Sequence, residues 1–154
     1  MITLRPAGRA DCGIILSFIR ELAEYEKMQD LVVADEKLIE KWLFDENAAK
    51  VIIAEYGGKA AGFCLYFTTY STFVGRAGIH LEDLYVKPEF RKKGIGKRLI
   101  SELAGICRKK GYGRLEWCCL DWNEPAREFY KSLGAKELGE WINFRVDGDA
   151  LEKL

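Results

Sequence analysis

Residues 89–99, EFRKKGIGKRL, place two glycines directly after three basic side chains, at the point where an apolar helical pattern begins. The first N–H groups of a helix have no partner within the helix and carry a partial positive charge, so they attract phosphate. Glycines at such a position let an oxygen-rich ligand reach these N–H groups without meeting a Cβ atom. The spacing therefore favours a phosphate-binding loop over the alternative, a tight turn with structural glycines. The side chains of Arg91, Lys92 and Lys93 contribute only if they face the ligand.

This loop differs from two common nucleotide-binding motifs. Arg98 follows Gly96-Lys97 at the position where a Walker A loop has Ser or Thr for magnesium. The glycine spacing also differs from G-x-G-x-x-G. The loop alone therefore indicates an anion site without naming the ligand.

A strand-like run, IHLEDLYV at residues 79–86, precedes the loop and carries Glu82 and Asp83. Because side chains alternate along a strand, the two carboxylates are predicted to point to opposite faces of the sheet. A carboxylate beside a site can attract a cation and accept its proton. On a strand it is more often simply solvated, and the pattern alone leaves both interpretations open.

The composition excludes several classes of function. Lys plus Arg number 24 and Asp plus Glu also number 24, so no global field favours nucleic acid or an anionic membrane, and we expect neither as a partner. His80 is the only histidine, and no partner spacing supports a Ser-His-Asp site or a zinc site, so no metal is expected. Five cysteines without zinc spacing predict reduced core thiols: Cys12, Cys64, Cys107, Cys118 and Cys119. The N-terminus does not resemble a signal peptide and no apolar run is long enough to span a membrane, so we expect a cytoplasmic protein.

Hydrophobic periodicity predicts how the elements follow one another. A first strand at 1–7, a helix at 9–28 with Asp11 as N-cap, and a second helix from Asp35 precede two strands joined by a hairpin at Gly57-Gly58. The remaining elements are expected as strand 79–86, helix 94–110, strand 112–122, helix 123–135 capped by Asn123, and a last strand at 140–146. This order predicts an α+β fold, with a mostly antiparallel sheet and one parallel strand–helix–strand unit from Ile79 to Leu120. No repeat or linker interrupts residues 1–154, which are expected to form a single domain.

Several motifs in this order resemble the Gcn5-related N-acetyltransferase superfamily, which has the acyl-CoA N-acyltransferase fold. They are an acidic-rich strand, an R-x-x-G-I-G loop, a helix, a strand and then WNEPAREFYKSLGA. The stretches IRELAEYEKM, YFTTYSTF, LEDLYVKPEFRKKGIG and LDWNEPAREFYKSLGA further resemble the diamine acetyltransferases, of the spermidine/spermine and thialysine types. The resemblance implies transfer of an acetyl group from acetyl-CoA, as co-substrate, to a primary amine in a ternary complex.

The resemblance also implies where acetyl-CoA binds. Family members often have glycine where Lys92 stands, and the polyamine enzyme carries a basic residue where Leu133 stands. The implied cofactor-binding residues are Leu84, Tyr85 and Val86 on the strand, Arg91, Lys92, Lys93, Gly94, Ile95, Gly96 and Lys97 in the loop, and Asn123, Glu124, Pro125 and Ala126 at the later helix.

The chemistry of amine acetylation sets the remaining roles. An ammonium group has no lone pair, so a base must remove its proton, and the resemblance implies Glu82 as base and cation anchor. Tyr130 matches the proton donor to the departing thiolate, while Tyr25 and Glu26 match residues that bind the amine chain.

The region around Ser71 bears on the choice of substrate and of protein partner. The polyamine enzyme has an acidic residue near Ser71 that is missing here, which favours a smaller diamine or lysine-like amine over spermine. Family members form homodimers, which the last strand and the region TYSTF could support. The alternatives are acetylation of protein amines or of an amino-sugar antibiotic, and a non-catalytic acyl-CoA-binding sensor.

Overall fold

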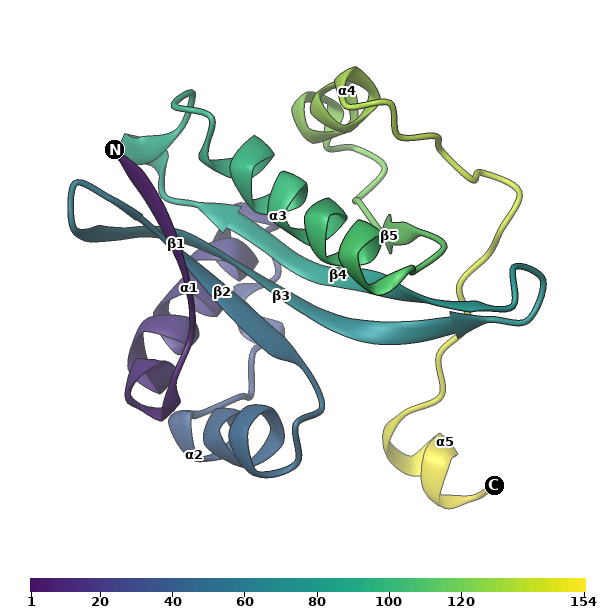
Figure 1. Ribbon diagram of the computed structural model, residues 1–154. Coiled ribbons are helices and arrows are strands. Elements are labelled where there is room, and N and C mark those ends of the chain that lie inside the picture. The colour runs from purple at the N-terminus through teal and green to yellow at the C-terminus, as the bar shows by residue number, and fades with distance from the viewer. The chain divides into compact units, whose positions relative to one another are not determined.

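The computed structural model describes residues 1–154, which form two compact units, Met1–Cys118 and Cys119–Leu154. The first unit contains a five-stranded sheet in the order β1-β2-β3-β4-β5 (Figure 1). Its strands are β1 (Ile2–Pro6), β2 (Lys50–Tyr56), β3 (Lys59–Ser71), β4 (Arg76–Val86) and β5 (Leu115–Trp117). All neighbouring pairs are antiparallel except β4 and β5, which run parallel. The mixed α+β architecture with one parallel crossover is therefore confirmed.

Helices cover both faces of this sheet. The helices of the first unit are α1 (Cys12–Tyr25), α2 (Glu36–Ile39), which continues as a π-helical turn at Glu40–Asp45, and α3 (Ile95–Lys110). Short 3-10 turns lie at Arg9–Asp11, Gln29–Leu31 and Pro88–Phe90. Figure 1 shows α3 in front of the sheet and α1 behind it.

The core behind the sheet depends on the apolar stripe of α1. Ile15 and Phe18 are essentially inaccessible, and the Phe18 ring stacks on Phe63 of β3 with 5.2 Å between ring centroids. On the other helix, Leu99 and Leu103 are equally buried. Both stripes follow the 3.6-residue period, so burial of apolar surface fixes which side of each helix faces the sheet.

Polar contacts fix where the early helices begin. Arg5 of β1 donates to both carboxylate oxygens of Asp11 at 2.8 and 2.9 Å, and to Glu55 at 2.8 Å. The guanidinium of Arg5 thereby holds the pKa of Asp11 below its usual range. Asp11 occupies the N-cap position of α1, as predicted, but its side chain bonds Arg5 and the Gly8 N–H instead of an amide of the helix. Asp35 caps α2 by accepting from the Leu38 N–H at 2.8 Å.

The second unit contains α4 (Glu124–Ser132) and α5 (Gly148–Glu152). The strand predicted at 140–146 is wrong, because this stretch forms no strand and pairs with none of the five strands. Alternating apolar residues meet the requirement for side-chain burial, but a strand also needs a partner for its main-chain groups. Trp141, Ile142 and Phe144 are accordingly 74%, 77% and 93% exposed.

The strand predicted at 112–122 is also shorter than expected, since β5 ends at Trp117. Cys118 and Cys119 therefore follow the strand and are exposed, which corrects the prediction that they are core thiols. Cys12, Cys64 and Cys107 are buried and free, as predicted. None of the helices combines the length and the apolar content that crossing a lipid bilayer requires.

Gly62 generates a prediction about packing between β3 and β4. A Cβ atom at Gly62 would lie 2.4 Å from the Tyr85 carbonyl oxygen and 3.1 Å from the Val86 Cα, both main-chain atoms that cannot yield easily. We expect Gly62→Ala to lower the free energy of unfolding by about 1–3 kcal/mol. In the control Gly105→Ala, the nearest atom is a flexible Arg108 nitrogen at 3.8 Å. That helix-interior change should raise the free energy of unfolding by about 0.5–1 kcal/mol. Urea-denaturation midpoints measure both, and equal effects would contradict the steric explanation.

Candidate active site

The loop between β4 and α3 leaves a run of main-chain donors without acceptors. The Arg91 N–H donates to the Pro88 carbonyl, and the next loop amide with an acceptor is Arg98, which donates to Gly94. The N–H groups from Lys92 to Lys97 lie between these two bonds and are available to a ligand. Such successive amides at a helix N-terminus form an anion-binding site.

The backbone of this loop is left-handed at two positions. Gly94, the N-cap of α3, has φ 82°, a conformation that glycine adopts without strain. Lys92 has φ 60°, which is uncommon for a residue with a side chain. The family's frequent glycine at this position is therefore explained by the backbone, and the lysine keeps the same conformation at an energetic cost.

The end of β4 has one open edge. Leu84, Tyr85 and Val86 pair with β3, whereas β5 pairs only with Ile79–Leu81. The edge of β4 beyond Leu81 that faces away from β3 therefore has no strand partner. An extended ligand with amide groups can add to such an edge by strand-like hydrogen bonds.

An irregularity in β4 changes where the two carboxylates point. The pairing with β3 passes from Leu65↔Asp83 to Tyr66↔Leu81, so Glu82 is an extra, bulged residue. The Glu82 carboxylate lies 3.4 Å from the His80 imidazole. On β3, Phe67 pairs with His80 and Leu65 pairs with Asp83. Phe67 and Leu65 are two residues apart, so their side chains and those of their partners lie on the same face of the sheet. His80, Glu82 and Asp83 therefore share one face. The prediction that Glu82 and Asp83 point to opposite faces is wrong, because it assumed uninterrupted alternation.

The carboxylates on this face are electrostatically unlike one another. The Glu82 side chain is 56% exposed. Burial, followed by the charges of Glu82 and Glu26, raises the pKa of Asp83 to about 6. Burial also raises the pKa of Glu26, which follows the last residue of α1. Three carboxylates from two elements thus share a partly dehydrated region, where a cation would relieve their repulsion.

Tyr25 and Arg91 connect the end of α1 with the loop. The Arg91 guanidinium carbon lies 5.2 Å from the centre of the Tyr25 ring and 5.7 Å from that of Tyr85. Its Nε donates to the Val86 carbonyl at 2.9 Å. Lys93 instead extends over the ring of Tyr56, at 5.3 Å. The sequence placed Arg91 and Lys93 in one group of loop cations. Their side chains point in different directions because they contact different aromatic rings, and those of Tyr25 and Tyr56 are distant in the sequence.

The remaining predicted site residues lie in the second unit, on and before α4. Asn123 is buried, and its side-chain oxygen accepts from the Ala126 N–H at 3.4 Å, which confirms it as the helix cap. Glu124 and Pro125 form the first turn of α4, as predicted. Half-buried Tyr130 lies later on the same helix, with its ring 5.4 Å from that of Phe129.

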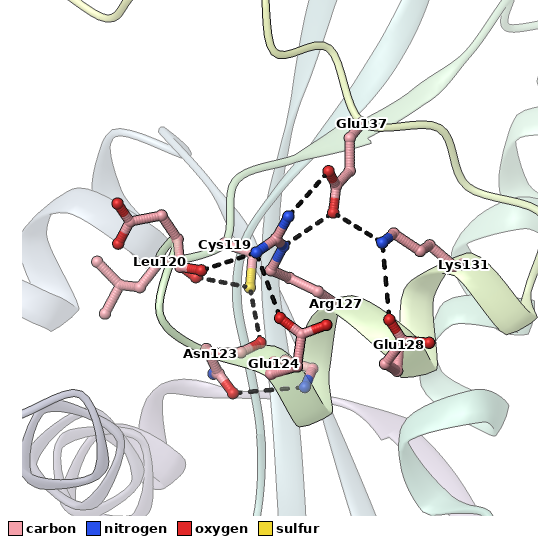
Figure 2. Close-up of polar contacts among 10 residues, drawn as sticks. Cys119, Leu120, Asn123, Glu124, Arg127, Glu128, Lys131 and Glu137 are labelled. Atoms are coloured by element: carbon pink, nitrogen blue, oxygen red, sulfur yellow. Dashed lines mark hydrogen bonds and ion pairs between the residues drawn. The ribbon is translucent and has the colours of Figure 1, made fainter.

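A network of charges that sequence reasoning missed holds α4 to the chain around it (Figure 2). Arg127 donates to both carboxylate oxygens of Glu137, at 2.8 and 3.1 Å, and to the Asp121 carbonyl at 3.0 Å. Lys131 lies 3.5 Å from Glu137 and 3.6 Å from Glu128. These contacts tie the segments before and after α4 to the helix itself, which carries Tyr130.

Comparison with known proteins identifies the family to which the chain belongs. Residues 16–135 match the model of the acetyltransferase (GNAT) family. The chain is 41% identical to the thialysine N-epsilon-acetyltransferase of Sus scrofa over 165 residues, which cover 99% of this chain and 96% of the relative. It is 40% identical to the Caenorhabditis elegans enzyme of the same name over 143 residues, covering 91% and 88%. An integron cassette protein of V. cholerae has a solved structure with TM-score 0.82 and 29% identity, covering 99% of this chain and 96% of that one.

The chain belongs to the GNAT family of acetyltransferases. The predicted family, fold class and enzyme class are thereby confirmed. Membership also implies acetyl-CoA as the donor. The available amides of Lys92–Lys97 and the open edge of β4 suit the phosphates and the amide-containing arm of this donor.

The partly buried Asp83 carboxyl of the acetyltransferase predicts a pH-dependent stability. Because its folded-state pKa of about 6 lies above the unfolded value, protonated Asp83 favours the folded protein at low pH. This contribution is lost as the pH rises through about 6. We expect Asp83→Asn to gain up to about 3 kcal/mol relative to the unchanged protein between pH 4 and pH 8, since each pKa unit corresponds to about 1.4 kcal/mol.

Denaturation curves at successive pH values measure this difference. The matched control is Asp149→Asn, at an exposed position. A difference between Asp83→Asn and the unchanged protein that stays constant over this pH range would show that Asp83 is not dehydrated in the folded state.

Proposed function

We propose that this acetyltransferase transfers the acetyl group of acetyl-CoA to a primary amine of a small diamine, polyamine or lysine-like molecule, with thialysine-type amines preferred. The observation that carries the proposal is the near full-length similarity to thialysine N-epsilon-acetyltransferases, at 41% identity over 99% of the chain. The reaction is a direct attack of the amine on the thioester in a ternary complex.

On the donor side, the main-chain amides of Lys92, Lys93, Gly94, Ile95, Gly96 and Lys97 hold the diphosphate. Their lack of acceptors within the protein supports this role. Leu84, Tyr85 and Val86 offer the strand edge to the pantetheine arm, and a main-chain N–H there stabilises the oxyanion of the tetrahedral intermediate. Asn123, Glu124, Pro125 and Ala126 are the proposed contacts at the start of α4.

On the acceptor side, Glu82 holds the ammonium and accepts its proton, directly or through water. The neutral nitrogen then attacks the acetyl carbonyl carbon, and the carbon–sulfur bond breaks. Glu26 adds a second carboxylate and Tyr25 an aromatic wall for the amine chain. The partly dehydrated carboxylates of this region support selection of a cation.

Tyr130 donates its phenolic proton to the departing thiolate, and the second proton that the attacking nitrogen loses as the amide forms restores the phenol. The hydrogen bond of the Asn123 cap and the Arg127–Glu137 pair support this role, because both hold the helix that carries Tyr130. Transfer of a proton by a positioned side chain typically contributes about 10²–10⁴-fold to a rate.

A homodimer is part of the proposal. Phe73, at the tip of the β3–β4 hairpin, is 100% exposed, and Phe144 after α4 is 93% exposed. Exposed aromatic side chains of this kind are enriched where protein surfaces associate.

The first prediction of this proposal concerns the acceptor. Incubation with acetyl-CoA and a panel of thialysine, lysine, short diamines, spermine, an aminoglycoside and a lysine peptide should release free coenzyme A. We expect the highest kcat/KM with thialysine or a short diamine, because the acid found near Ser71 in polyamine enzymes is absent. Mass spectrometry identifies the acetylated product.

The other outcomes separate the alternatives. Acetylation confined to the peptide or the aminoglycoside would show that the acceptor class is wrong. Calorimetric binding of acetyl-CoA without acetylation of any amine would favour a sensor.

The second prediction concerns the acid. We expect Tyr130→Phe to lower kcat about 10²-fold or more while the Kd for acetyl-CoA stays unchanged, since only the phenolic proton is removed. Stopped-flow release of the thiol and calorimetry measure the two quantities. Tyr112→Phe, outside the proposed site, is the control and should keep full turnover. Unchanged kcat in Tyr130→Phe would assign the proton to another donor.

A further inference from the structure

Arg91 occupies a junction of three segments. Its Nε bonds the last carbonyl of β4, at Val86, and its own N–H closes the 3-10 turn at Pro88. The guanidinium carbon lies close to the rings of Tyr25, at the end of α1, and Tyr85, near the end of β4. Lys93 of the same loop extends instead to the ring of Tyr56.

These contacts indicate that the Arg91 side chain is directed back into the protein. A bidentate contact with phosphate uses two parallel N–H groups of the guanidinium, and with Nε bonded to Val86 only the pair of Nη groups is left for one. Here the Nε edge is used by Val86, and two aromatic rings lie beside the group. The available main-chain amides begin only at the next residue, Lys92.

Tyr85 also packs against α1, with its ring 6.2 Å from that of Phe18. The Tyr85 side chain is buried, and this burial, followed by the Glu21 carboxylate of α1, raises the pKa of its hydroxyl to about 12. Glu21 also lies 3.3 Å from the ammonium of Lys87. The middle of α1 is therefore fastened to β4 without Arg91, whereas the contact between Arg91 and Tyr25 links the loop to the end of that helix.

From this geometry we infer that Arg91 is a positioning residue that couples occupancy of the donor loop to the amine site. The inference rests on the proposed function, in which Lys92–Lys97 hold the diphosphate while Tyr25 and Glu26 contact the amine. Fixing the loop fixes the guanidinium, and the guanidinium holds the Tyr25 ring. When a ligand orders one site, less conformational entropy is lost in ordering the other site. The effect acts in both directions, because the coupling free energy between two binding sites is reciprocal.

The test measures coupling rather than activity. Calorimetry gives the Kd of coenzyme A, which cannot transfer an acetyl group, without and with saturating thialysine. We expect thialysine to tighten coenzyme A binding about three- to fivefold, as an exposed cation–π contact would allow. In Arg91→Gln, the ratio of the coenzyme A Kd without thialysine to the Kd with thialysine should fall to about one. Arg91→Lys keeps the charge but loses the planar fork, so its ratio should also fall.

A second pair of variants tests the other partner of the contact. Tyr25→Phe keeps the ring and should keep the ratio, whereas Tyr25→Leu removes the ring and should lose it. This pair also serves if Arg91→Gln fails to fold. A merely structural role of Arg91 would lower thermal stability without changing the ratio.

The outcomes separate this inference from the proposed function. A ratio of one in the unchanged protein, or the same ratio in Arg91→Gln and Tyr25→Leu, would overturn the coupling while acetylation of thialysine continued. Absence of coenzyme A binding to the unchanged protein would overturn the proposed function itself.

Discussion

The start of α3 depends on hydrogen-bond donors that the protein does not satisfy. Main-chain amides at a helix N-terminus need acceptors, and side-chain caps usually provide one. Here Gly94 occupies the N-cap position and has no side chain to offer. Water can solvate these amides in the free protein, but an anion with several oxygens satisfies them together and also interacts favourably with the helix dipole. The glycines that weaken the helix start are thus what makes the loop a binding surface.

The acidic face of β4 presents the complementary problem. A regular strand would separate Glu82 from Asp83, whereas the bulge brings both carboxylates to the side where Glu26 ends α1. Like charges in a partly dehydrated region raise the cost of ionisation, which is why the pKa of Asp83 rises to about 6. An arriving ammonium lowers that cost, so the repulsion among these carboxylates favours binding of a cation. Bulges commonly re-aim side chains beside functional sites, and this one does so with a single extra residue.

Local chemistry explains which features were predictable from sequence. The beginning of α3, the Asn123 cap and the order of strands follow from glycines, capping residues and apolar periods that lie within a few residues of one another. The bulge at Glu82 depends on the pairing of β4 with β3, so alternation within β4 alone predicted the wrong face. The direction of Arg91 depends on Tyr25, which is distant in sequence. Residues 140–146 have the composition of a strand, but no neighbouring strand pairs with them. Family motifs indicated candidate site residues that periodicity could not, including Tyr130, whose role stays a prediction.

One strand and the loop after it carry groups for both halves of the proposed reaction. Glu82 lies at the bulge, Leu84 to Val86 form the open edge, and Arg91 follows after one short turn. Because the backbone of β4 is held by β3 along its length, the separation of these groups is set by the spacing of a strand and not by flexible side chains. Gly62 preserves this arrangement by letting β3 approach the Tyr85 carbonyl without a Cβ atom between them. Orientation of two reactants accounts for a large part of the barrier to a bimolecular transfer. A shared strand meets that requirement with few residues, and the open edge of β4 is the structural cost, because a fully paired strand would have no edge left for the donor.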